Sequence, residues 1–278
     1  MKISNIVLIS FTIPWIDKYS PYARQLNLLG HYLDSERITW ISLGKTSELS
    51  LKHPEYNITY IGGGFENKPV IISELNELIS HHTDDKSVII SLCDMNRFVM
   101  DTKFVMPSIA WFPMHHELLD RNTIHTLSNF DVIVVLNPSN VQNLQAQIPN
   151  SNVTHIPHMI THYEPKNKQS IQKKYNLPSN HFIVGMVFGN YDTLNRKSVD
   201  VGIFAFKNLV ENMENIKCHM YIRAVTINNS IGHVQQLDIM NMIYMANISD
   251  YVTIDTTERT YEEGIELLSA IDVLLHPS

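Results

Sequence analysis

Short apolar runs alternate along this chain with longer segments in which apolar residues recur at helical spacing. This alternation is typical of βα units stacked around a parallel sheet. In the first half the pattern predicts strands at residues 5–11, 38–42, 58–61, 87–92, 108–112, 132–136 and 153–156. Between them it predicts helices at residues 22–33, 70–81, 117–127 and 139–147.

The second half repeats the pattern after a polar interval. Residues 162–181 contain two prolines and no apolar run, so they predict a connector with one short helix. A second series follows, with strands at 183–188, 218–223, 251–254 and 272–276 and helices at 199–213, 234–246 and 261–270. The sequence therefore predicts an α/β protein with two Rossmann-like parallel-sheet domains, residues 1–163 and 164–278. Because the chain stops at a strand end, the second domain is predicted to be incomplete at its C-terminus.

Composition narrows the class of protein. The 278 residues are 44% hydrophobic and 18% charged, as in an ordinary globular protein. The net charge of −7 and the lack of a long basic run argue against general nucleic-acid binding. No segment has the roughly 20 apolar residues of a membrane span. Cys93 and Cys218 lie far apart in apolar surroundings, which favours free thiols in the cytoplasm.

Two adjacent cations, Arg196 and Lys197, stand where an apolar strand gives way to a helical pattern. A helix N-terminus offers free N–H groups and partial positive charge, and the two side chains add charge-assisted hydrogen bonds. The stretch therefore predicts an anion-binding site, and a diphosphate is the expected ligand. The alternative is a solvated pair at a helix start, which the helix dipole mildly disfavours.

Other polar residues follow predicted strands, at the sheet edge that carries ligands in α/β proteins. Asp94 is placed to bind a substrate hydroxyl, and His115 or His116 to bind a sugar hydroxyl or phosphate. Arg223 ends a strand and is a candidate for a nucleotide or diphosphate. The simpler alternative for each of these residues is a solvated surface side chain without a function. No Asp-x-Asp, GxSxG, GxGxxG or CxxC occurs, which weakens the hydrolase, dinucleotide-binding and metal-site readings.

Several segments together resemble GT-B glycosyltransferases of family 4. SNVTHIPHMITHYEP (151–165) resembles the family's strand-to-linker signature, and GNYDTLNRKSVDVGIFAFKNL (189–209) resembles its donor-binding loop and helix. HMYIRAV, VTIDT and YEEGIELLSAIDVLLHPS are similar to the segments that follow, and WFPMHHELL looks like an FPVDG segment of the first domain. The likeness spans most of the chain and is weak in the first 100 residues.

The resemblance implies retaining, metal-independent transfer of a sugar from a nucleotide-diphosphate sugar, with no other cofactor. The first domain would hold the acceptor, a glycan, protein or lipid, near Asp94 and a catalytic His115 or His116. The second would hold the donor, with Arg196, Lys197 and Asn190 on the diphosphate and Arg223 on the nucleotide. Fixed positive groups there would stabilise the charge that grows on the leaving diphosphate.

Three departures qualify the resemblance. Ser198 replaces the glycine that follows the family's lysine, and Met159 replaces that of IPHG. The family's EGFG loop and paired glutamates are expected just past Ser278, so this chain is predicted to be truncated and to turn over little substrate. Two alternatives stay open: a non-catalytic GT-B-like partner subunit, and a GT-B-type sugar-nucleotide epimerase. The donor base, the acceptor and the oligomeric state stay undetermined.

Overall fold

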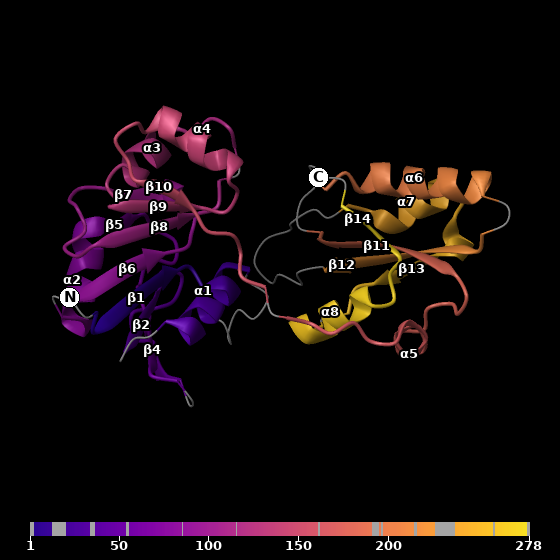
Figure 1. Cartoon of the computed structure of the whole chain (residues 1–278), viewed down its shortest axis with the longest axis horizontal. Coiled ribbons are helices and arrows are strands. Elements are labelled where there is room, and N and C mark those ends of the chain that lie inside the picture. Colours follow the sequence, from indigo (N-terminus) through magenta and orange to yellow (C-terminus); the bar gives the residue numbers. More distant parts are fainter. Residues whose placement is uncertain are drawn as a thin grey trace. The chain divides into compact units, whose positions relative to one another are not determined.

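A computed structural model describes residues 3–12, 21–33, 37–53, 56–84, 86–114, 116–160, 162–190, 195, 197–213, 216–225, 237–257 and 259–276. The chain divides into two compact units, Met1–Thr161 and His162–Ser278. This division falls two residues before the predicted boundary at 163/164. Each unit is built around a sheet of mainly parallel strands, so the predicted α/β class with two Rossmann-like domains is confirmed (Figure 1).

The described residues of unit 1 form an eight-stranded sheet of order β10-β9-β8-β6-β1-β2-β4-β3 (Figure 1). Neighbouring strands are parallel except for β3, which runs antiparallel to β4. Within this sheet a strand was predicted at every described position except β3, whose three residues are all exposed and so carry no burial signal. The strands are β1 (Asn5–Ser10), β2 (Ile38–Ser42), β3 (Ser50–Lys52), β4 (Ile58–Gly62), β6 (Ser87–Ser91), β8 (Ser108–Phe112), β9 (Val132–Val135) and β10 (Val153–His155).

The helices of unit 1 are α1 (Pro21–Tyr32), α2 (Ile72–His82), α3 (Arg121–Leu127) and α4 (Ser139–Gln147), with a 3-10 turn η1 (Met95–Arg97). The predicted start of a helix at residue 117 is wrong. The Asp120 side chain accepts from the Thr123 backbone N–H and ends the loop there, so α3 begins four residues later. The predicted helix start at residue 70 is also wrong, because β5 (Val70–Ile71) pairs with β7 (Phe98–Val99) before α2 begins.

Alternate residues of each strand face opposite sides of this sheet. Val7 and Ile9 of β1 belong to a core that also contains buried residues of α2, α3 and α4. Ile6 and Leu8 of the same strand belong to a second core that contains α1. Among the described residues, three helices thus cover one face and one helix covers the other.

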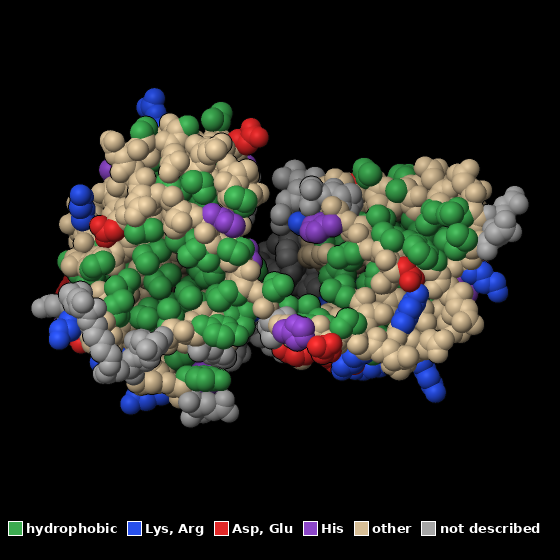
Figure 2. All heavy atoms as spheres, in the orientation of Figure 1, with side chains coloured by type: hydrophobic (Ala, Val, Ile, Leu, Met, Phe, Trp, Pro, Cys, Tyr) green, Lys and Arg blue, Asp and Glu red, His purple; other side chains and the backbone are tan. Residues whose placement is uncertain are grey.

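The single-helix face leaves part of the sheet open. In the view of Figure 1, β6, β8 and β9 lie clear of the drawn helices, and Figure 2 shows hydrophobic side chains gathered over that region. A small cavity of about 130 Å³ on this face is lined by apolar residues of α1, β6, β8 and β9 together with Ile156 and Met159. Gln25 of α1 fastens the chain here, because its side chain exchanges two hydrogen bonds with the Met159 backbone, at 2.7 and 2.9 Å.

Unit 2 contains a parallel sheet of order β13-β12-β11-β14. Helices α6 and α7 pack on one face and α5 and α8 on the other (Figure 1). The predicted helix at 234–246 begins later among the described residues, where the Asp238 side chain caps α7 by accepting from the Asn241 N–H; residues 234–236 lie outside them. The elements are α5 (Lys168–Lys174), β11 (Phe182–Gly189), α6 (Val199–Asn212), β12 (Cys218–Val225), α7 (Ile239–Met245), η2 (Ser249–Tyr251), β13 (Val252–Asp255), α8 (Tyr261–Leu268) and β14 (Val273–Leu275).

A buried carboxylate organises the α8 side of unit 2. Asp255 is 7% exposed, accepts from the Tyr221 hydroxyl, and pairs with Arg259 through Nε at 2.7 Å and Nη2 at 2.6 Å. Burial raises the pKa of Asp255, but hydrogen bonds from Tyr221, Thr257 and Arg259 outweigh it and bring the pKa to about 2. The carboxylate therefore stays charged and joins β12, β13 and the start of α8.

A second carboxylate ties the connector to α8. Glu266 pairs with Lys174 at 2.5 Å and Lys166 at 2.9 Å, and it accepts from the Tyr175 hydroxyl at 3.1 Å. These hydrogen bonds, that of Lys174 first, lower the pKa of Glu266 to about 2. The short helix predicted in the connector is therefore tied to α8 by charge, and its buried Ile171 packs in the core on this side of the sheet.

Cys93 and Cys218 are both buried free thiols, as predicted. Within the described residues, no helix has the length and apolar character that crossing a bilayer requires.

We expect Asp255→Asn to lower the free energy of unfolding of unit 2 by about 2 kcal/mol, because Arg259 and Tyr221 lose a charged partner in a buried setting. Urea-dependent hydrogen exchange of unit 2 peptides measures this change. Glu262→Gln, at an exposed position of α8, is the control and should leave exchange unaltered. Equal exchange in both variants would contradict the assigned role of Asp255.

Acid should destabilise unit 2 through His219 of β12. Burial, with help from His181, lowers the pKa of His219 to about 4, whereas an unfolded histidine has about 6.5. The unfolded state then binds the extra proton, so the stability contribution is complete above pH 6.5 and is lost as the pH falls towards 4. Between pH 7 and 5 we expect a loss of about 1 kcal/mol after allowance for solvent screening.

His219→Gln tests this origin, since glutamine keeps a hydrogen bond to the Thr253 hydroxyl but does not titrate. Unfolding by urea at the two pH values should show a smaller pH dependence in this variant. His125→Gln, at an exposed position of α3, should behave as the wild type does. An unchanged pH dependence in His219→Gln refutes the assignment.

Candidate functional site

In unit 1, a cavity of about 210 Å³ lies at the carboxyl ends of β6 and β8. Asp94 and Asn96, which follow β6, line it together with His116, which follows β8. The start of α3 contributes Asp120 and Thr123. The structure thus brings together Asp94 and His116, two of the residues selected from the sequence; His115 lies outside the described residues.

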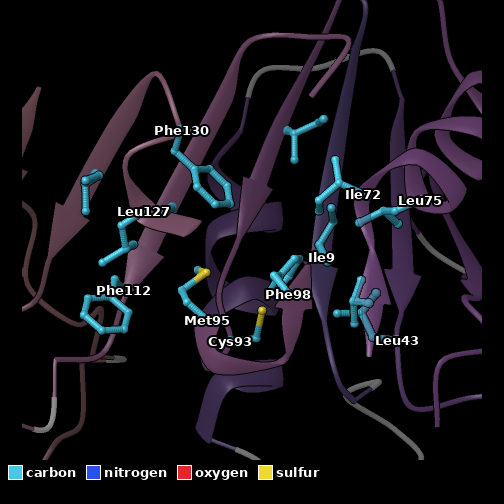
Figure 3. Packing of buried hydrophobic residues seen from close by; sticks show 14 of the residues in the cluster. Ile9, Leu43, Ile72, Leu75, Cys93, Met95, Phe98, Phe112, Leu127 and Phe130 are labelled. Carbon is cyan, nitrogen blue, oxygen red and sulfur yellow. The ribbon is translucent and has the colours of Figure 1, made fainter. Parts of the chain in front are cut away.

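The backbone around Asp94 is fixed from within the core. Its neighbours Cys93 and Met95 are 0% and 1% exposed, and Figure 3 shows both side chains among Phe98 and the other core residues. Asp94 itself is exposed. Burial raises the pKa of the Cys93 thiol to about 12, so that thiol is a packing group and not a nucleophile.

Tyr22 of α1 also reaches this site. Its hydroxyl donates to Asp94 Oδ1 at 3.3 Å. Burial and the nearby Asp94 charge raise the pKa of Tyr22 well above its usual value, so the phenol keeps its proton and orients the carboxylate. The sequence pattern did not single out Tyr22, although its position near the start of the first predicted helix was the available signal.

His116 does not open a helix as predicted. It lies in the loop between β8 and α3, exposed, five residues before the first residue of α3. Asp120 is committed to capping, since it accepts from the Thr123 N–H at 3.0 Å and from the Thr123 hydroxyl at 2.6 Å. Of the three ionisable side chains described in this cavity, Asp120 caps a helix, whereas Asp94 and His116 do not.

In unit 2, the connection from β11 to α6 carries the predicted anion site. Residues 191–194 and Arg196 lie outside the described residues. Asn195 caps the helix, because its Oδ1 accepts from the Val199 N–H at 2.8 Å and its side-chain amide donates to Asp200 at 2.5 Å. Lys197 is half-buried and makes no ion pair with a described residue. It stands at the carboxyl edge of β11, directly before α6.

Ser198 has a left-handed backbone, with φ 45° and ψ 47°, and its side chain caps nothing. Glycine adopts this conformation without strain, whereas other residues pay for the crowding of Cβ. The departure from the Lys-Gly pair of the resembling family therefore falls at a position whose backbone favours glycine.

Asn190, the first residue after β11, is 4% exposed and is engaged on both sides of its amide. It donates to the Leu237 carbonyl and accepts from the Leu237 N–H, both at 3.0 Å. These bonds fasten the end of β11 to the segment that enters α7. Its contact with a diphosphate stays a prediction.

Arg223 lies near the carboxyl end of β12, in register with Val187 of β11 and Asp255 of β13. The neighbouring Asp255 forms its ion pair with Arg259, and Arg223 makes no ion pair with a described residue. Its guanidinium rests against Gly264 of α8, where an added Cβ would lie 2.7 Å from Nη1. Its Nε is buried without a hydrogen-bond partner. A positive donor group without an ion-pair partner among the described residues thus stands at the same sheet edge as Lys197.

The described residues contain no group of three or more His, Cys, Asp or Glu side chains placed to hold a metal ion.

Comparison with solved structures identifies the architecture. Sucrose-phosphate synthase from Thermosynechococcus elongatus superposes with a TM-score of 0.66 at 16% identity, over 99% of this chain and 75% of that one. The fold is of the GT-B type. A UDP-forming α,α-trehalose-phosphate synthase from Burkholderia xenovorans, in complex with glucose-6-phosphate, gives 0.66 at 11% identity over 98% and 78% of the two chains.

The N-terminal domain of Candida albicans trehalose-6-phosphate phosphatase gives a TM-score of 0.67 at 9% identity, over 99% of this chain and 76% of that one. No protein-family model matches the sequence. No curated protein matches it either. At these identities the comparisons establish the GT-B fold and leave the reaction to be argued from the residues.

We expect Ser198→Gly to raise the free energy of unfolding of unit 2 by about 1 kcal/mol, because glycine relieves the left-handed strain. Ser198→Ala is the matched control. It keeps a Cβ and removes only a hydroxyl that caps nothing, so its stability should stay within about 0.5 kcal/mol of the wild type. Urea unfolding measures both, and an equal gain in the two variants would rule out backbone strain as the cause.

Proposed function

We propose that this chain is a GT-B glycosyltransferase, related to family 4, that takes its sugar from a UDP-sugar and acts in the cytoplasm. The observation that carries the proposal is the presence of Lys197 and Arg223, two cations that form no ion pair with a described residue, at the carboxyl edge of the unit 2 sheet. The UDP-forming activity in the name of a similar structure supports uridine as the base.

In the proposed reaction the bond between the anomeric carbon and the diphosphate oxygen breaks, and its electron pair leaves with the diphosphate. Lys197 and Arg223, with Arg196, stabilise that charge where it develops. The absence of Asp-x-Asp from the sequence supports side chains rather than a metal ion in this role. Asn190 holds the loop that carries Lys197 through its bonds to Leu237.

The cavity of unit 1 is proposed to bind the acceptor. Asp94, oriented by the Tyr22 hydroxyl, accepts a hydrogen bond from the acceptor's hydroxyl group. His116 takes the proton as the acceptor oxygen bonds to the anomeric carbon. Retention of configuration is part of the proposal and rests on the resemblance to family 4. A sugar phosphate is the first acceptor to test, because one similar structure is a complex with glucose-6-phosphate.

A second candidate is a GT-B domain without transferase activity. It is favoured by the similarity to the N-terminal domain of a protein named as a phosphatase. The two candidates differ in one measurable property. A transferase releases UDP from a UDP-sugar when an acceptor is added, whereas the second candidate does not.

We expect Lys197→Gln and Arg223→Gln each to weaken UDP binding by about tenfold or more, because each removes a charge-assisted bond to the diphosphate. Isothermal titration calorimetry measures the Kd. Lys207→Gln is the matched control, since Lys207 lies within α6 and pairs with Glu211 at 3.7 Å. It should bind UDP as tightly as the wild type.

Two results would refute the assignment. In one, the wild-type chain does not bind UDP. In the other, UDP binds with the same affinity to the wild type and to both glutamine variants.

A further inference from the structure

A large cavity, here called the basin, lies at the edge of the unit 2 sheet opposite to Lys197 and Arg223. It has a volume of about 820 Å³ and opens at the amino ends of the strands. His219 and Thr253, which line it, are the second residues of β12 and β13, and His181 directly precedes β11. Helix α5 and the loop at 176–180 form the other wall. Lys197 and Arg223 stand at the other ends of these strands, so this basin is separate from the proposed donor edge.

The chemistry of the basin matches a neutral, polyhydroxylated molecule. Nine of the eleven described residues that line it have polar side chains. Carboxamides and hydroxyls both donate and accept hydrogen bonds, as sugar hydroxyls do. The single cation, Lys173, is balanced by Asp250. The carboxamides and hydroxyls of the lining belong to Gln169, Asn176, Asn180, Ser179 and Thr253.

Other ligand classes fit this lining less well. An anion would meet one cation and an opposing carboxylate, and an apolar ligand would bury many polar groups without partners. The basin's ionisable groups also form no cluster placed to hold a metal ion within the described residues. Its volume lies in the range of small-molecule sites, which run from about 300 to 1,000 Å³.

The walls of the basin are held in place before any ligand arrives. Asn176 and Asn180 have left-handed backbones, with φ of 53° and 60°, and fix the turn between α5 and β11. The His181 ring contacts the Ser179 carbonyl at 3.0 Å, and the His219 ring contacts the Thr253 hydroxyl at 2.8 Å. A preformed site spends little binding free energy on ordering its own groups.

From this geometry we propose that the basin at the amino edge of the unit 2 sheet binds a neutral saccharide, independently of the nucleotide. The carboxamides of Asn176 and Asn180 bond the hydroxyl groups, and the half-buried Pro178 supplies apolar surface for the C–H face of a sugar ring. The site adds a second carbohydrate contact to unit 2 and does not depend on transferase activity.

Maltotriose, a neutral probe, tests the proposal by saturation-transfer NMR on the whole chain. We expect it to bind the wild type and to lose about tenfold or more in affinity in the double variant Asn176→Gly/Asn180→Gly. Glycine keeps the left-handed turn while removing both carboxamides, so the fold should persist. A thermal unfolding scan of the variant checks this.

Asn247→Gly is the matched control, because Asn247 has the same left-handed backbone, with φ 58°, beyond the end of α7 and outside the basin. It should bind maltotriose as the wild type does. Neither UDP nor inorganic phosphate should displace the probe. The proposal is overturned by an absence of maltotriose binding, by equal binding in the double variant, or by displacement with either competitor.

Discussion

A parallel sheet gathers the carboxyl ends of all its strands along one edge, and this constraint places the candidate chemistry of the protein. In unit 1 it brings the residues after β6 and β8 to one cavity, so that Asp94 and His116 share it. In unit 2 it sets Arg223 of β12 at the same edge as the loop from β11 to α6. With antiparallel neighbours, each pair would stand at opposite ends of its sheet.

The parallel arrangement of the strands also explains why much of the fold could be predicted from the sequence. Strands buried on both faces are short continuous apolar runs, and those at Ile38–Ser42 and Ser108–Phe112 were predicted to the residue. The pattern failed where a partner or a cap sets the structure. Exposed β3 is defined by pairing with β4, and α3 starts where Asp120 finds the Thr123 N–H.

The candidate sites were predictable in their position and less so in their connections. A polar residue after an apolar strand is visible in the sequence, which is how Asp94 and Arg223 were selected. The bond from Tyr22 to Asp94 joins residues 72 positions apart, and that from Asn190 to Leu237 spans 47. No local pattern records such pairs. The left-handed backbone at Ser198 is likewise a property of the folded loop, although the missing glycine marked the position.

The strand order of unit 2 also governs how this unit forms during synthesis. β14 is made after the other three described strands of this sheet, yet it pairs with β11, the first of the four. Asp272, just before β14, accepts from the Ile183 N–H of β11 at 2.7 Å and pairs with Lys168 of α5 at 2.5 Å. The side of β11 that pairs with β14 therefore lacks this partner while roughly 90 further residues are synthesised. At ordinary elongation rates this interval lasts several seconds. Over that interval the nascent chain exposes a strand edge that a chaperone or a neighbouring nascent chain can occupy first.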